Sequence, residues 1–120
     1  RVCFHDGVEE LATGLTLHRV GGHSAGLQVV RVWTKRGWVV IASDAAHLYA
    51  NMSRKLPFPA VYHVGEMMEG HRLVHQLASS ADHVIPGHDP LVMALYPAPA
   101  PELEGRVVRL DVAPKTAGQV

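Results

Sequence analysis

Three short segments of the sequence place metal-ligand side chains beside glycines or just after an apolar run. His23 lies in Gly-Gly-His-Ser-Ala-Gly, Asp44 in Ser-Asp-Ala, and His88 in Pro-Gly-His-Asp-Pro. Imidazole and carboxylate groups are the usual protein ligands of zinc and related transition metals. Any one of these segments alone is more often ordinary turn chemistry. Together, in this order, they predict a site that holds metal.

The elements expected around these segments bring them to one rim of a sheet. Hydrophobic alternation and β-branched runs predict strands over 15–20, 27–34, 37–43 and 83–85. The second and third of these form a hairpin in which Gly37 supplies a positive φ. Each ligand-bearing segment follows the end of one strand, and loops at strand ends share an edge of the sheet.

Helical patterns are fewer, and they place the chain in the α/β class. A short helical turn is expected over 45–49, and apolar spacing without proline predicts one long helix over 64–80. A last short strand is expected over 106–110, and a loose tail from Ala113. The continuously apolar run 38–42 is typical of a strand that is covered on both faces.

Composition excludes several classes of protein. The chain has 120 residues, 48% of them hydrophobic, with 11 Lys+Arg against 11 Asp+Glu. This balance predicts one small globular domain without the basic surface that binds nucleic acid. The apolar runs are too short to span a membrane. A single cysteine fits a reducing compartment and predicts a cytoplasmic protein. Nine histidines are the unusual feature, since histidine is the commonest metal ligand.

The motifs GGHSAG, SDAA and IPGHDP, in this order, resemble the C-terminal half of the metallo-β-lactamase-fold hydrolases. The resemblance runs from about Leu15 to about Pro101 and is greatest to the N-acyl-homoserine lactonase-like proteins. It implies an α/β fold: the C-terminal half of an αββα sandwich, with a mixed sheet and helices on one face.

The resemblance also implies a chemistry. In that family, residues that correspond to His23 and His88 each complete one metal site, and the residue that corresponds to Asp44 bridges the two metals. An intact protein would hold two divalent ions, with zinc favoured. It would open the ring of a small-molecule N-acyl-homoserine lactone through a metal-bridging hydroxide. A thioester hydrolase resembling glyoxalase II is an alternative with the same fold.

The sequence departs from the family pattern in its first half. The family motif His-x-His-x-Asp-His is absent, and His5-Asp6 is only a fragment of it. We therefore expect residues 1–120 to form a single truncated domain that binds metal weakly or not at all and is inactive alone. A half-domain leaves part of its sheet uncovered, which predicts self-association. A non-catalytic half that packs against a partner is a further alternative.

A second departure follows the predicted bridging aspartate. The lactonases have a tyrosine three residues after it that contacts the substrate carbonyl, whereas this chain has His47 there and Tyr49 two residues later. Either side chain can donate a hydrogen bond to a developing oxyanion, so both are candidate catalytic residues; packing beneath the loop is the equal alternative. His71 and His75 are predicted to lie on an ordinary half-exposed helix face, because Arg72 replaces the glutamate of a zinc-binding HExxH motif.

Overall fold

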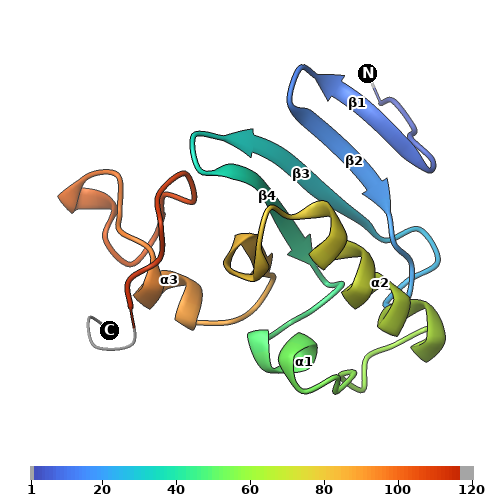
Figure 1. Ribbon diagram of the computed structural model, residues 1–120. Coiled ribbons are helices and arrows are strands. Elements are labelled where there is room, and N and C mark those ends of the chain that lie inside the picture. Colours follow the sequence, from blue (N-terminus) through green and yellow to red (C-terminus); the bar gives the residue numbers. More distant parts are fainter. Residues whose placement is uncertain (1, 117–120) are drawn as a thin grey trace.

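A computed structural model describes residues 2–116 of the chain, which form a mixed five-stranded sheet with helices packed against it (Figure 1). The strands lie in sequence order: β1 (Val8–Ala12), β2 (Leu15–Arg19), β3 (Gln28–Thr34), β4 (Gly37–Ser43) and β5 (Val84–Pro86). All neighbouring pairs are antiparallel except β4 and β5, which are parallel. The helices are α1 (Tyr49–Ser53), α2 (Val64–Leu77) and α3 (Leu91–Leu95), with 3-10 turns at Ala81–His83 and Pro101–Leu103. The predicted α/β class with a mixed sheet is confirmed.

The β3–β4 hairpin has the predicted position and turn. Thr34 pairs with Gly37, and Gly37 has a φ of 111°, which is accessible to glycine at little cost. The Thr34 hydroxyl donates to the carbonyl of Gly37 at 2.9 Å and closes the turn. The hairpin sets the register of β4, the strand that ends beside Asp44.

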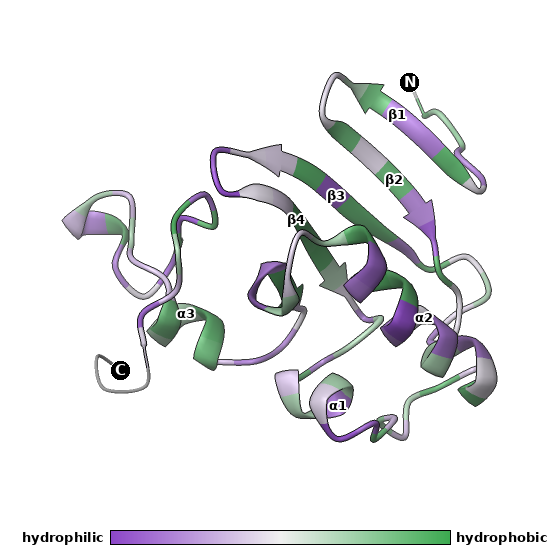
Figure 2. Ribbon diagram, in the orientation of Figure 1, coloured by the Kyte–Doolittle hydropathy of each residue, from purple (hydrophilic) through white to green (hydrophobic). Residues whose placement is uncertain are grey.

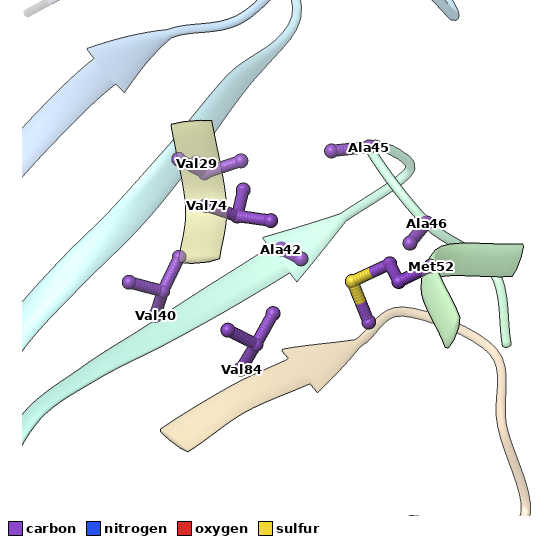
Figure 3. Close-up of a cluster of buried hydrophobic side chains, with 8 residues drawn as sticks. All are labelled: Val29, Val40, Ala42, Ala45, Ala46, Met52, Val74 and Val84. Atoms are coloured by element: carbon purple, nitrogen blue, oxygen red, sulfur yellow. The ribbon is translucent and has the colours of Figure 1, made fainter. Parts of the chain in front are cut away.

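Helix α2 covers one face of the sheet and encloses the main hydrophobic cluster. The side chain of His63 caps its first turn by accepting from the backbone N–H of Glu66 at 3.0 Å. Figure 3 shows Val74 of α2 above β3 and β4, with Met52 of α1 closing the cluster at its side. The cluster comprises Val29, Val40, Ala42, Ala45, Ala46, Met52, Val74 and Val84. Each fully buried valine contributes about 1.5–3 kcal/mol to stability.

The opposite face of the sheet is covered at only one end. Val39 and Ile85 pack there with Tyr96, beneath the short and almost uniformly hydrophobic helix α3 (Figure 2). Toward β2 the cover ends. Leu17, Val30 and Ile41 lie in one row across the sheet, and Ile41 is 40% exposed. The expected burial of both faces of β4 is therefore seen at Val39 but not at Ile41.

Four local expectations differ from the structure. The segment 45–48 makes turns, and α1 begins only at Tyr49. Helix α2 ends at Leu77, because the backbone is already extended at Ala78. Residues 106–110 form no strand: Arg106 and Val107 donate to the Leu103 carbonyl of the preceding 3-10 turn, and Val108 and Leu110 pack against the cluster of Val39, Ile85 and Tyr96. Strand β1, whose five residues are all exposed, was not expected. Of the predicted loose tail, residues 117–120 lie outside the described part of the chain.

A search of the described helices for one long and apolar enough to cross a membrane finds none.

Candidate metal centre

The three predicted ligand segments meet where β4 and β5 end. Because these strands are parallel, Asp44 and His88 both follow carboxyl ends at the same edge of the sheet. Two backbone hydrogen bonds join the following loops: Gly87 N–H donates to the Ala46 carbonyl, and His88 N–H to the His47 carbonyl, both at 2.9 Å. The loops therefore hold the side chains of Asp44, His47 and His88 together.

The carboxylate of Asp44 lies at the middle of a group of three imidazoles. One of its oxygens, Oδ1, lies 2.7 Å from Nε2 of His88 and 3.3 Å from Nε2 of His47. The other, Oδ2, lies 3.9 Å from Nε2 of His23. The structure thus brings together all three residues predicted as ligands, and it adds His47.

Two unusual backbone features place Asp44 and His88. Ser43, immediately before Asp44, has a φ of 47°, a left-handed conformation that is costly for a side chain and often found at functional sites. Gly87, immediately before His88, passes so close to this turn that a β carbon would lie 2.6 Å from the Ser43 carbonyl oxygen. Only glycine allows the two loops to approach in this way.

A second pair of glycines positions His23. Gly21 and Gly22 have positive φ values and lie against the first turn of α2, where a β carbon on Gly22 would lie 2.6 Å from Cα of Met67. Nδ1 of His23 lies 2.7 Å from the carbonyl oxygen of Ala60. A carbonyl can only accept, so Nδ1 carries a proton, and Nε2 is the nitrogen that faces Asp44. A second hydrogen bond of this kind fixes the tautomer of metal-ligating histidines.

His47 is fixed by ring packing. Its imidazole stacks on Phe58 with 3.5 Å between ring centroids and an interplanar angle of 12°, and Phe58 is itself buried. The ring of His88 lies edge-on at 4.5 Å. Burial, followed by repulsion from His88, lowers the pKa of His47, although Asp44 partly opposes this. The neutral imidazole that results is the form that binds metal.

The electrostatics of the cluster suit a divalent cation. Across residues 2–116, no lysine or arginine pairs with Asp44, whose ionic partners are histidines. One ligand atom each from Asp44, His47 and His88 lies within 4.8 Å of the others. A carboxylate facing imidazoles, with no lysine or arginine beside it, is the donor set of a zinc-type site. The residues present therefore fit a metal ion.

The second predicted catalytic residue, Tyr49, lies elsewhere. Its side chain packs against the main hydrophobic cluster. Burial, then the proximity of Tyr96 and Asp89, raises the pKa of its phenol, which also hydrogen-bonds Tyr96. No contact of this side chain with Asp44 or His47 is seen in the described residues. The geometry therefore gives no support for Tyr49 as a substrate contact.

Other polar residues near the cluster have structural roles. Asp89 accepts hydrogen bonds from the backbone N–H groups of Tyr49 at 2.9 Å and Leu91 at 3.0 Å, so it anchors the starts of α1 and α3. His5 pairs with Glu9. Phe58 and the Ala60 carbonyl, which hold His47 and His23, were not predicted, because no local pattern connects residues 58–60 to either histidine.

Comparisons with known proteins give the fold. No family model matches the sequence, and no curated protein matches it significantly. Among solved structures, an N-acyl homoserine lactone hydrolase with bound N-hexanoyl-L-homoserine matches 75% of this chain with a TM-score of 0.67 and 23% identity. A quorum-quenching N-acyl homoserine lactone lactonase matches 72% (TM-score 0.64, 24% identity), and a probable metal-dependent hydrolase from Staphylococcus aureus matches 77% (TM-score 0.60, 16% identity).

The chain therefore has part of the α/β fold of these hydrolases, the metallo-β-lactamase fold. Within that fold, the structures that it matches include the N-acyl homoserine lactone lactonases, as the sequence motifs predicted. The chain spans 36% and 37% of the length of those two lactonase chains and 32% of the Staphylococcus aureus hydrolase.

Proposed function

We propose that this chain is the metal-binding half of a metal-dependent hydrolase whose intact form opens the ring of N-acyl homoserine lactones. The observation that carries the proposal is the convergence of His23, Asp44 and His88 on one rim, without a lysine or arginine partner for the carboxylate in the described residues. The lactonase structures that share the fold support the substrate class.

Each residue of the cluster has a distinct part in this proposal. His23 and His88 would hold the ion through imidazole nitrogens, and Asp44, which faces both, would neutralise part of its charge. A bound divalent ion, with zinc favoured and two ions in the intact protein, supplies Lewis acidity that polarises a carbonyl and acidifies a water molecule. The Ala60 carbonyl keeps His23 in the tautomer that presents Nε2.

The loop beside the cluster offers a surface for an acyl chain. Phe58 is buried against the rings of His23 and His47. On the same loop, Leu56 is 54% and Tyr62 is 70% exposed. An apolar wall next to a hydrolytic site suits the acyl group of a lactone better than the charged peptide of a glutathione thioester. We therefore favour the lactone over the thioester as substrate, and both compounds should be assayed.

The test is hydrolysis by the full-length gene product loaded with zinc. We expect it to open N-decanoyl homoserine lactone and to leave S-lactoylglutathione largely intact, and we expect Asp44→Asn to lower kcat/KM by at least 100-fold. Asp6→Asn, the same change at an exposed carboxylate, is the matched control and should have no effect. Zinc-loaded protein that hydrolyses neither compound would refute the proposal, and preference for the thioester would replace its substrate.

The partly open sheet face favours one further role, self-association. Leu17, Val30 and Ile41 form an apolar row that α3 does not reach. We propose that two copies of this chain cover these rows against each other when the chain is expressed alone. Sedimentation velocity should then show a dimer that Ile41→Lys converts to a folded monomer. A monomeric parent chain would exclude this role.

A further inference from the structure

We propose that His47 is a metal ligand, and that Asp44, His47 and His88 bind one divalent ion within this chain. The inference rests on the proposed metal-dependent function for the presence of an ion, but it assigns a new role to His47. It also reverses the expectation that the chain alone binds metal weakly or not at all.

The spacing of the ligand atoms supports this assignment. Zinc bonds of 2.0–2.1 Å in a tetrahedron place neighbouring ligand atoms about 3.3 Å apart. The Asp44 carboxylate oxygen Oδ1 lies 3.3 Å from Nε2 of His47 and 2.7 Å from Nε2 of His88. Small movements of these three side chains are enough to enclose an ion. The corresponding distance from Asp44 Oδ2 to His23 is 3.9 Å, so His23 approaches from the other side of the carboxylate.

The surroundings of His47 also fit a ligand better than a mobile substrate contact. Its ring is stacked on the buried Phe58, and its backbone carbonyl accepts from the N–H of His88. The peptide unit of one proposed ligand is thus bonded to that of the next. An imidazole held on both sides keeps Nε2 aimed at Asp44, as a first-row metal site requires.

The identity of the residue completes the argument. Where the resembling lactonases have tyrosine, this chain has histidine, and a neutral imidazole binds zinc far more readily than a phenol does. Three protein ligands with a water molecule in the fourth position make a complete zinc coordination set. His47 therefore supplies a third ligand from within this chain, beside Asp44 and His88.

The test is metal binding by the 120-residue chain, which is stripped of metal and titrated with Zn²⁺ by calorimetry and with Co²⁺ by visible absorption. We expect one ion per chain and the intense visible bands of four-coordinate cobalt. His47→Tyr should weaken zinc binding at least 30-fold and abolish the four-coordinate cobalt spectrum. His75→Tyr, the same change at an exposed histidine of α2, should change neither. His47→Gln with an unchanged circular dichroism spectrum separates loss of the ligand from loss of the fold.

Several results would overturn the inference: no bound ion, two ions per chain, or equal zinc affinity in the parent and His47→Tyr. These outcomes are separable from the fate of the hydrolase proposal. Binding of one ion that depends on His47, with no hydrolysis by the full-length protein, would sustain the inference and refute the hydrolase. Hydrolysis with ion binding independent of His47 would do the reverse.

Discussion

The two ends of the sheet carry clusters built from the same kinds of residue, yet they are organised in opposite ways. At one end, Asp44 faces imidazoles and has no cationic partner in the described chain. At the other end, beside the β3–β4 turn, Asp82 and His83 surround the guanidinium of Arg36. Arg36 supplies there the positive charge that the first cluster lacks.

The Arg36 cluster is internally complete. The guanidinium donates to the Asp82 carboxylate at 2.6 Å, to the Val112 carbonyl at 3.0 Å and to the Tyr96 hydroxyl at 3.3 Å. His83 Nε2 in turn hydrogen-bonds the Arg36 carbonyl at 2.7 Å. Such a cluster has no need of an external ion, whereas Asp44 has no lysine or arginine beside it in the described residues. Both clusters contain histidine and aspartate. An arginine inside the cluster indicates a structural role, whereas a carboxylate without one indicates a candidate metal site.

The largest expected change in stability comes from removing the guanidinium of Arg36. Arg36 has a side-chain exposure of only 9%, and Arg36→Met keeps its aliphatic bulk while leaving several carbonyl and hydroxyl groups without a donor. We expect the free energy of unfolding in urea to fall by about 3 kcal/mol. Zinc affinity at Asp44 should not change. Lys35→Met is the matched control, because Lys35 pairs with Asp111 at the exposed surface and should contribute less than about 0.5 kcal/mol. Equal losses in the two variants would remove the contrast between the clusters.

A smaller effect is expected at the metal end, through the backbone. Gly87→Ala would place a β carbon 2.6 Å from the Ser43 carbonyl oxygen, so the loops that carry Asp44 and His88 must separate. We expect a loss of about 2 kcal/mol in the free energy of unfolding and a roughly tenfold lower zinc affinity. Gly26→Ala is the control, since a β carbon there meets nothing within 4 Å. Wild-type zinc affinity in Gly87→Ala would show that the glycine does not set the ligand geometry.

The sequence predicts the cluster around Asp44 but not the cluster around Arg36. His23, Asp44 and His88 each follow a strand signal or glycine punctuation, so local pattern alone brought them to one rim. The Arg36 cluster has no such local sequence pattern. From the sequence, Arg36 is predicted to be an ordinary hairpin turn residue. Its hydrogen-bond partners lie 46 to 76 residues later in the chain. Long-range donor–acceptor pairing leaves no periodic trace in a sequence, so it was not predicted.

The same limit explains the details that sequence missed in the site and the fold. His47 was a candidate for substrate contact because it stands where the resembling lactonases have a tyrosine. Its stacking on Phe58 depends on how the loop 54–63 folds back. Strand β1 was missed because its residues are exposed and show little alternation; pairing with β2 alone makes it a strand. Hydrophobic pattern predicts elements that bury a face, and neither of these features does so.

His71 belongs to neither cluster, and it provides the smallest test of the contrast between them. It lies on α2, is 5% exposed, and neither ring nitrogen has a well-formed hydrogen bond within residues 2–116. Burial lowers its pKa, as does the proximity of His75, while the backbone of Ala45 opposes the shift. Lys55 and Arg72 line the pocket beside it. A buried imidazole with neither an ion nor an arginine to satisfy it should cost stability rather than supply it.

The sign of the pH dependence follows from the lowered pKa. The unfolded chain takes up a proton on this histidine near pH 6.5, before the folded chain does. The free energy of unfolding is therefore greatest above pH 6.5 and falls as the pH drops from there toward the folded pKa, by up to about 1.4 kcal/mol per pH unit for one proton. His71→Leu should make this acid slope shallower, and His18, whose pKa burial also lowers, should maintain part of it.

At pH 7.5 the same variant tests whether the imidazole is unsatisfied. Leucine fits beside Met52 and Met68 in the pocket that His71 lines and removes two buried nitrogens that make no well-formed hydrogen bond in the described residues. We expect His71→Leu to raise the free energy of unfolding by about 1 kcal/mol. His75→Leu, on the exposed side of α2, should leave both the stability and the acid slope within about 0.5 kcal/mol of the parent. Destabilisation by His71→Leu at pH 7.5 would show that the buried imidazole of His71 has a partner and stabilises the fold.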